Sequence, residues 1–318
     1  MKKVIVSVPG KVHLLGEHAV VYGKPALLAA INLRLTVTIS AQTEKGKKGV
    51  TIVSEEPIDH AAYAVNYLFT VLKVQYPSPI VVTIDSDIPA GFHLGSSAAV
   101  AVGLTGAIMY YYTKLWNPMR INELAYEIEK KQHGTPSGGD NTTVTMGGFI
   151  WFRKELEFLK SIWQLPFHPH PSLNHFFLIN TGRPKESTGE MVAMVRERVQ
   201  THASEMRAVL DLNEAQVKRV TVALKNGDEA ELLDALRVGE RTLETMGVVS
   251  TKVIPLLRAI EKEGGAAKIL GGGGKADGVG FLLCYHHDFK RVAALSKEYR
   301  YTIQPIILGG EGIRLEER

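Results

Sequence analysis

The pattern of apolar and polar residues along the chain predicts strands in both halves of the sequence. Short runs rich in β-branched and other apolar residues, bounded by turn-forming residues, are typical of strands. In the first half these runs are Lys3–Val8, Leu33–Ser40, Val50–Ser54, Ile80–Ile84 and Gly148–Phe152. In the second half they are Phe176–Ile179, Ala267–Leu270, Gly278–Tyr285 and Tyr301–Ile307.

Apolar residues at helical spacing predict helices between these strands. We expect helices at Ala61–Val74 (with Asp59 as its cap), Ser96–Tyr112, Ile121–Gln132 and Asp288–Glu298, and several more from Thr188 to about Ile260. The strands and helices are mixed without a regular alternation. This favours an α+β fold in two lobes over a doubly wound sheet or a barrel.

A stretch rich in proline and histidine, Leu165–Pro171, is the best candidate for a linker between the two lobes. A chain of 318 residues is also long enough for about two domains. We therefore expect an N-terminal domain over residues 1–172 and a C-terminal domain over residues 173–318.

Composition narrows the class of protein. Hydrophobic residues make up 45% and charged residues 22%, which is ordinary for a globular protein and excludes a disordered, collagen-like or coiled-coil chain. A net charge of +4 argues against a protein that coats nucleic acid, but not against an anionic substrate. The longest uncharged stretch, Ile88–Thr113, is interrupted by proline and glycine, so we expect no membrane span. The single cysteine, Cys284, excludes an intrachain disulfide and favours a reducing, cytoplasmic location.

The glycines gather in three clusters: Pro9–Lys11 continuing through Leu15–His18, then Pro89–Ala99, and then Lys268–Lys275. In the second cluster a glycine-bearing loop leads into a helix that opens with Ser96 and Ser97. Free amides and the dipole at a helix start attract phosphate. An ordinary turn glycine followed by a capping serine explains the same residues, so the pattern alone leaves both readings open. The third cluster fits neither a P-loop nor a dinucleotide motif, and a flexible turn explains it.

Two carboxylates follow on the next predicted helices. Glu129 lies on a helix that ends near Gly134, and Asp140 lies in the first turn of another helix that starts near Pro136. Each has an ordinary explanation, as a solvated helix charge and as an acid favoured by the helix dipole.

Taken together and in this order, the segments resemble the GHMP kinase superfamily, and within it most closely the mevalonate kinases. The motifs match at Pro9–Val12 with Gly16–Ala26, at Pro89–Ala99, at His133–Asn141 and, only in part, at Lys268–Gly274. The third of these segments looks like the catalytic-aspartate motif of the family. The resemblance spans the chain from Pro9 to about Gly280.

The resemblance implies a two-lobed fold with a ribosomal protein S5 domain 2-like N-terminal domain and a ferredoxin-like C-terminal domain. It implies transfer of the γ-phosphate of ATP to the C5 hydroxyl of mevalonate, giving 5-phosphomevalonate and ADP. The implied cofactors are ATP and Mg²⁺, and the implied partners are small molecules, with no nucleic acid and no membrane. A homodimer is plausible on the resemblance alone.

The resemblance also assigns roles to residues. Asp140 and Lys11 would be catalytic, and Ser97 and Glu129 would hold Mg²⁺. The mevalonate side would be contacted by Glu17, His18 and, less securely, Thr188. The residues that match the family's ATP-binding loop are Gly91, His93, Leu94, Gly95, Ser96, Ser97 and Ala98.

Some positions depart from the family pattern. Phe92 and His93 stand where small residues are common, Leu270 where a threonine is common, Gly139 where a larger apolar residue is usual, and Lys275 where another glycine is usual. None of these departures removes a residue to which the resemblance assigns catalysis or metal binding.

Three other functions remain as alternatives: another GHMP kinase, acting on phosphomevalonate, homoserine or a sugar; an ATP-dependent decarboxylase of the same fold; and a non-catalytic ligand sensor. The run Gly16–Gly23 disfavours the first, and the pattern of Glu129, His133 and Asp140 disfavours the second. The sensor is disfavoured because Lys11 and Asp140 are both present.

Overall fold

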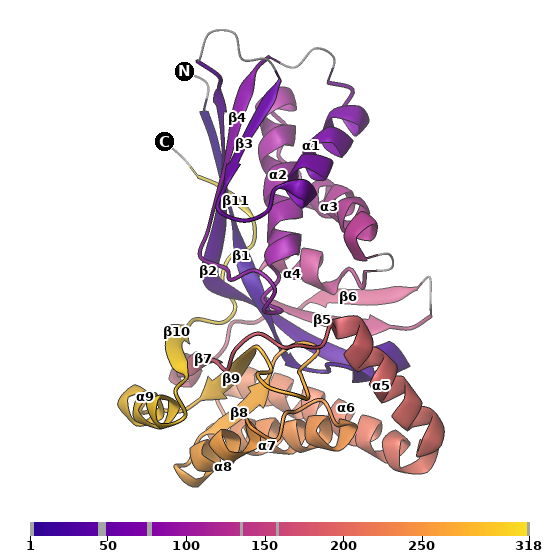
Figure 1. Ribbon diagram of the computed structural model, residues 1–318, viewed down its shortest axis with the longest axis vertical. Helices are drawn as coiled ribbons and strands as arrows, with labels where there is room; N and C mark the ends of the chain where they lie inside the picture. The colour runs from indigo at the N-terminus through magenta and orange to yellow at the C-terminus, as the bar shows by residue number, and fades with distance from the viewer. Residues whose placement is uncertain (1–2, 44–48, 75–77, 134–135, 157–158, 317–318) are drawn as a thin grey trace.

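The structure is a computed structural model that describes residues 3–43, 49–74, 78–133, 136–156 and 159–316. Two sheets, one above the other in Figure 1, give the molecule an elongated shape. In the described residues the upper sheet has the strand order β11-β1-β2-β4-β3, with β5 paired to β2 and β6 paired to β5. Its strands are β1 (Lys3–Leu15), β2 (Pro25–Ala41), β3 (Val50–Ser54), β4 (Ile80–Ser86), β5 (Phe149–Lys154), β6 (Lys160–Gln164) and β11 (Arg314–Leu315).

Helices cover one face of the upper sheet (Figure 1). They are α1 (Asp59–Val71), α2 (Ser96–Thr113), α3 (Pro118–His133) and α4 (Gly139–Met146). The central helix, α2, is rich in small residues, and this lets it lie close to the strands. A Cβ atom on Gly103 would come within 2.8 Å of the Val37 side chain on β2. The small residues therefore fix the depth at which the start of α2 meets the sheet.

The lower sheet has the antiparallel order β10-β7-β9-β8. Its strands are β7 (Phe176–Asn180), β8 (Ala266–Ile269), β9 (Phe281–Tyr285) and β10 (Thr302–Ile306). Between β7 and β8 come α5 (Thr188–Thr201), α6 (Ala203–Asn226), α7 (Glu229–Met246) and α8 (Ile254–Lys262), and α9 (Phe289–Glu298) joins β9 to β10. If the four strands are numbered 1 to 4 in chain order, their order across the sheet is 4-1-3-2, which is a ferredoxin-like arrangement. The expected α+β fold with a ferredoxin-like lower lobe is confirmed.

Several element boundaries differ from the sequence expectation. β1 continues through Pro9 and Gly10 as far as Leu15, so the first glycine cluster begins inside a strand. The pairing of β1 with β2 shifts register between Pro9 and Lys11, which accommodates a residue without an amide hydrogen. Asp59 is the first residue of α1 rather than its cap, a position that Ile58 holds. β6 and β11 were not predicted, because both are short and, for β11, the partner strand β1 lies at the other end of the sequence.

The chain passes between the lobes along the expected linker, Leu165–Pro171. Phe167 of this segment stacks on Phe149 of β5, with ring centroids 5.3 Å apart. Near the other end of the chain, Leu315 of β11 pairs with Val6 of β1 in the upper sheet. The division into residues 1–172 and 173–318 stays a prediction, and the last described residues lie on the upper sheet.

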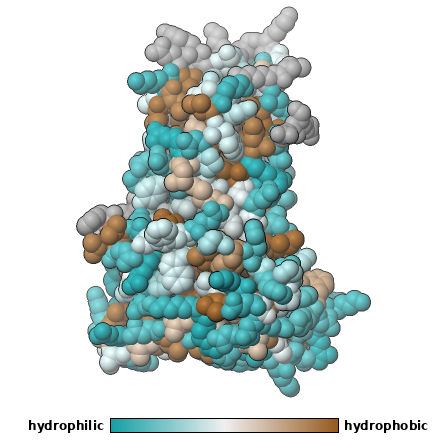
Figure 2. Space-filling model, turned by 180° about the vertical axis from the view of Figure 1, so that it is seen from behind, coloured by the Kyte–Doolittle hydropathy of each residue, from teal (hydrophilic) through white to brown (hydrophobic). Residues whose placement is uncertain are grey.

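Over the described residues, no helix combines the length and the apolar character that crossing a membrane requires. Figure 2 shows hydrophilic residues over most of the wide lower part of the molecule on this face, with hydrophobic residues in smaller groups. Cys284 is buried in β9, surrounded by apolar neighbours of the lower core.

Candidate active site

A cavity of about 720 Å³ collects residues from both lobes, a volume typical of small-molecule sites. Most of the residues singled out in the sequence lie around it. The upper lobe contributes, among others, Lys11, His13, Glu17, His18, Gly91, His93, Gly95, Ser96, Ser97, Glu129 and Asp140. The lower lobe contributes Arg183, Glu186, Ser187, Thr188, Gly271 and Gly272, among others.

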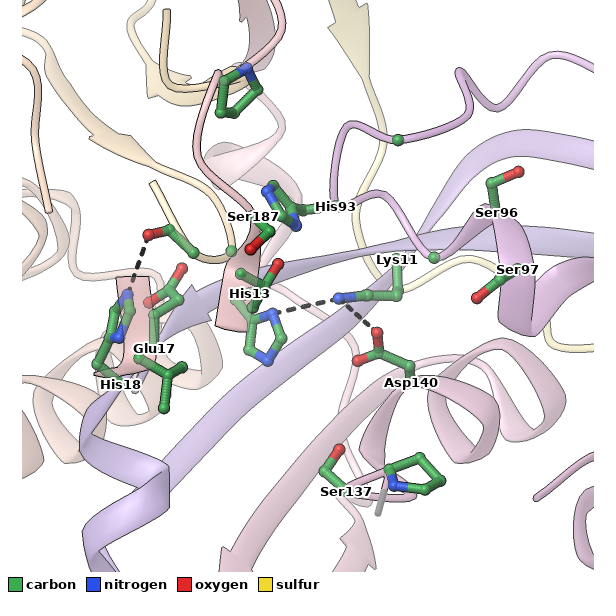
Figure 3. Close-up of a pocket in the computed structure, with 18 of the residues that line it drawn as sticks. Lys11, His13, Glu17, His18, His93, Ser96, Ser97, Ser137, Asp140 and Ser187 are labelled. Carbon is green, nitrogen blue, oxygen red and sulfur yellow. Dashed lines mark hydrogen bonds and ion pairs between the residues drawn. The ribbon is translucent and has the colours of Figure 1, made fainter. Parts of the chain in front are cut away.

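An ion pair between Lys11 and Asp140 lies at the centre of the cavity (Figure 3). The Lys11 Nζ atom is 2.9 Å from Asp140 Oδ2, and the Lys11 side chain is buried. Asp140 lies in the first turn of α4, where the helix dipole favours a negative charge. Its side chain is 41% exposed, so a ligand in the cavity has access to the carboxylate.

His13 lies beside this pair and was missed in the sequence. Its Nδ1 atom is 3.3 Å from Lys11 Nζ. Burial, reinforced by the nearby ammonium of Lys11, holds the pKa of His13 well below its usual range. A neutral His13 accepts a hydrogen bond from Lys11 at Nδ1. The signal that could have revealed it is strand alternation, because residues two apart on β1 face the same side.

The first turn of α2 lies next to Lys11 and has no side-chain cap. Gly95 is the N-cap, with φ of 79°. The amides of a first turn have no partner within the helix, so they can bind an anion. The Lys11 amide donates to the Leu94 carbonyl at 2.9 Å, and a Cβ on Gly95 would come within 2.8 Å of Lys11 Cγ. A glycine at position 95 therefore lets the ammonium and the amides share one site.

The predicted ATP-binding residues do not all lie on the cavity. Gly91, His93, Gly95, Ser96 and Ser97 line it. Leu94 and Ala98 are each 1% exposed and pack in the core, so only their backbone is available to a ligand.

His93 adopts a left-handed backbone, with φ of 63°. Burial, and then the charge of Lys11, lowers its pKa to about 4. Its ring lies against Gly271 of the lower lobe, where a Cβ would come within 2.4 Å of it. A neutral His93 thus links the loop before α2 to the third glycine cluster. The neighbouring Phe92 packs edge-on against Phe281 of the lower sheet.

The two predicted metal ligands contact each other. The Ser97 hydroxyl donates to Glu129 Oε2 at 3.0 Å, and Glu129 is buried. His60 of α1, which was missed in the sequence, places its Nε2 atom 3.3 Å from Glu129 Oε1. In the part of the chain that is described, no three His, Cys, Asp or Glu side chains form a metal-binding cluster. A hydroxyl and a carboxylate beside a phosphate site nevertheless fit Mg²⁺, which takes few protein oxygens and fills its shell with phosphate and water.

Glu17 and His18 lie at the other end of the cavity (Figure 3). His18 Nε2 donates to the Gly272 carbonyl at 3.1 Å, which leaves Nδ1 as an acceptor without a partner among the described residues. Burial lowers the pKa of His18, so the ring is neutral. Glu17 Oε2 is also buried without a partner in the described structure. Both groups can accept hydrogen bonds from the hydroxyls of a ligand.

Thr188 is the first residue of α5, directly after the N-cap Ser187, which forms a capping box with Glu190. Thr188 lines the cavity, and its hydroxyl lies 3.4 Å from where a Cβ on Gly272 would stand. The predicted position of Thr188 beside the site therefore agrees with the geometry.

The segment His133–Asn141 and the third glycine cluster contribute fewer residues to the cavity than the sequence suggests. Gly134 and Thr135, with the side chain of His133, lie outside the described residues. Lys275 is exposed and does not line the cavity; its amide and that of Ala276 donate to the Glu186 carboxylate. Lys268 was noted only as the start of a partial motif, yet its Nζ atom lies 2.5 Å from Glu17 Oε1 in the buried interior.

Comparisons with known proteins agree with this geometry. Residues 59–148 match the family described as GHMP kinases N terminal domain, and residues 1–41 match a galactokinase galactose-binding signature. The mevalonate kinase of Pyrococcus furiosus is 32% identical, over 99% of both chains. That of Pyrococcus horikoshii is 30% identical, over 100% of this chain and 99% of the relative. The structure of L. major mevalonate kinase in complex with R-mevalonate superposes with a TM-score of 0.81 at 22% identity, covering 98% of this chain and 97% of the other, and shows the shared fold.

Proposed function

Because the chain belongs to the mevalonate kinases of the GHMP kinase family, we propose that it transfers the γ-phosphate of ATP to the C5 hydroxyl of mevalonate. The products are 5-phosphomevalonate and ADP. The observation that best supports this is the Lys11–Asp140 pair at the uncapped start of α2. It brings an acceptor for a hydroxyl proton, a cation and a phosphate-binding helix start into one cavity.

The triphosphate of ATP binds at the first turn of α2. Gly95, Ser96 and Ser97 of this turn line the cavity, and the helix dipole favours the negative charge. The neutral ring of His93 adds no charge there, whereas Lys11 packs against Gly95 and brings its ammonium group to this turn.

Asp140 orients the substrate hydroxyl and accepts its proton as the oxygen bonds to the γ-phosphorus and the bond to the ADP oxygen breaks. Lys11 stabilises the charge that spreads over the transferring phosphoryl group. Positioning and electrostatics supply most of the catalysis in such transfers. The 2.9 Å contact lets Lys11 hold the Asp140 carboxylate in place before the substrate arrives.

Glu17 Oε2 and His18 Nδ1 lie at the end of the cavity away from Asp140, where they accept from the substrate hydroxyl that is not phosphorylated. Both are buried acceptors, so a ligand that lacked hydroxyls would leave them unsatisfied. Thr188 contributes a hydroxyl from the lower lobe, so the two lobes share the substrate site.

Ser97 and Glu129 hold Mg²⁺ in this proposal, and the ion neutralises phosphate charge when it is bound. The change Glu129→Gln removes the anionic oxygen, so the Mg²⁺ concentration for half-maximal activity rises about tenfold or more. A Mg²⁺ titration of ADP release at saturating ATP measures the effect. The matched control is Glu127→Gln, two residues earlier on the exposed side of α3. An unchanged Mg²⁺ requirement in Glu129→Gln would remove this residue from the metal site.

A coupled assay of ADP release tests the function. Mevalonate, phosphomevalonate, homoserine and galactose are supplied side by side with ATP and Mg²⁺. We expect kcat/KM to be highest for mevalonate by at least about a hundredfold. Galactose belongs in the panel because residues 1–41 match the galactokinase signature. A preference for another member of the panel would replace the substrate, and no ADP release with any of them would count against a kinase.

Two further properties rest on the family resemblance. We propose a cytoplasmic location and a homodimer, and neither is needed to complete the cavity described above. Sedimentation equilibrium of the purified chain distinguishes a dimer from the 34.9 kDa monomer. Fractionation of the producing cells tests the location.

A further inference from the structure

Three ionisable side chains are buried at the substrate end of the cavity. The mechanism above uses only one of them, Glu17. Lys268 on β8 and Glu240 on α7 are fully buried, and Glu17 is 3% exposed. Glu17 lines the cavity, whereas Lys268 and Glu240 do not. The lower lobe thus places two ionisable groups behind a residue of the upper lobe.

Lys268 forms a buried ion pair with Glu17. Its Nζ atom lies 2.5 Å from Glu17 Oε1, and it also donates to the carbonyls of Ile269 and, at 3.4 Å, His13. These three acceptors account for the three hydrogens of an ammonium group. Lys268 is therefore fully hydrogen-bonded and holds one oxygen of Glu17, while the other oxygen, Oε2, has no partner among the described residues.

Glu240 makes a different contact. Its Oε2 atom accepts from the Ile269 amide at 3.0 Å, while Oε1 is buried without a partner among the described residues. No ion pair joins Glu240 to Lys268 in the described structure. A buried carboxylate without an ion-pair partner is costly, and this favours the protonated form of Glu240 against the opposing charge of Lys268. Burial raises its pKa to about 8, which agrees.

We propose that Lys268 is a positioning residue for mevalonate binding, because it keeps Glu17 ionised and oriented. Glu240 stays a neutral acid, so it does not compete with Glu17 for the ion pair with Lys268. The inference rests on the proposed function for the identity of the substrate. Lys268 itself touches no substrate. With Glu240 neutral, the buried group carries one positive and one negative charge.

The charges around Glu17 decide how it responds to the loss of Lys268. Burial raises its pKa, and the ammonium groups of Lys268 and, more weakly, Lys11 oppose that rise. The remaining titratable neighbours are neutral: His13 on β1, His18 beside Glu17, and Glu240 on α7. Removing Lys268 leaves a backbone hydrogen bond and the weaker influence of Lys11 to oppose burial, so Glu17 takes up a proton at a higher pH.

The first experiment compares pH profiles of kcat/KM for mevalonate in the wild type, Lys268→Met, Lys268→Gln and Lys268→Arg. The acid limb of each profile is the fall of kcat/KM towards low pH. In the two neutral variants the midpoint of this limb moves to a pH about one unit or more higher. At pH 7 the KM for mevalonate rises about tenfold, and kcat falls by a smaller factor. Lys268→Arg keeps a cation and so keeps the limb within a few tenths of a unit of its wild-type position.

Lys290→Met is the matched control, because Lys290 is an exposed residue of α9 in the same lobe. Thermal unfolding confirms that each variant is folded. An acid limb that does not move in a folded neutral variant would overturn the proposal, as would an equal shift in Lys290→Met.

A second measurement needs no turnover and therefore separates this inference from the proposed function. Carbon NMR of carboxyl-labelled glutamate in the wild-type protein reports which side chains are ionised, and Glu17→Gln and Glu240→Gln assign the two signals. At pH 7 we expect an ionised Glu17 and a protonated Glu240. A protonated Glu17, or an ionised Glu240, contradicts the inference even if the enzyme phosphorylates mevalonate. An enzyme that ignores mevalonate but shows these two states contradicts only the proposed function.

Discussion

At the scale of single residues, the contact between Lys11 and Asp140 carries the proposed chemistry. The change Asp140→Asn keeps the shape of the side chain but removes the proton acceptor, so kcat falls about 10²- to 10⁴-fold. ATP binding changes little, because the helix start that holds the triphosphate is intact. Single-turnover kinetics and nucleotide titration measure the two effects. Near-normal turnover in this variant would remove Asp140 from catalysis.

Glu240 gives a second prediction at this scale. A carboxyl group with a pKa of about 8 in the folded chain and an ordinary value of 4.5 in the unfolded chain binds its proton only when folded between those pH values. The free energy of unfolding therefore decreases as pH rises through this window, by about 1 kcal/mol per pH unit from this group.

The variant Glu240→Gln lacks this titration. Denaturant unfolding of the two proteins from pH 5 to 8 should show the wild type losing stability relative to Glu240→Gln as pH rises. A constant difference between them would show that Glu240 titrates normally.

At the scale of elements, the loop before α2 depends on Gly95. Alanine there faces a positive φ and the side chain of Lys11, so Gly95→Ala costs about 1–2 kcal/mol of stability and lowers kcat as Lys11 is displaced. Gly264→Ala is the matched control: its φ is 92° and nothing lies within 4 Å of the added methyl group. It should lose similar stability but keep its kcat. Equal kcat values in the two variants would contradict the role given to Gly95.

The same elements show what the sequence could and could not predict. β3 and the start of α2 fall where local pattern places them, because a run of β-branched residues and a glycine-serine start are local signals. Lys11, Ser97, Glu129 and Asp140 could be predicted because they lie in motifs. His60 and Lys268 could not, because their roles come from contacts between distant elements, whereas strand alternation on β1 could have revealed His13 beside Lys11. In the sequence, Glu240 resembles an ordinary exposed charge on an amphipathic helix. Only the fold shows that β8 packs against it and that the Ile269 amide donates to its carboxylate.

At the scale of the whole molecule, residues 307–316 run from β10 of the lower sheet to the upper sheet and contact α2 and α4 on the way. Ile313 is 8% exposed and packs against Gly106 of α2, and its amide donates to the Thr145 carbonyl of α4 at 3.0 Å. The change Ile313→Ala should lower the free energy of unfolding by about 2–4 kcal/mol. Ile307→Ala is the control, because that side chain is 57% exposed, and it should cost far less. Thermal or urea unfolding measures both, and similar losses would mean that the segment does not support the core.

The pairing of β11 with β1 also constrains how the chain is made. β1 is synthesised before its edge partner β11, and the hydrogen bond from Ser7 to Glu316 joins positions 309 residues apart. During synthesis the exposed edge of β1 can pair with another nascent chain. We therefore expect slowed translation or crowded polysomes to favour aggregates of this protein, and a supply of the β11 segment as a free peptide to suppress them.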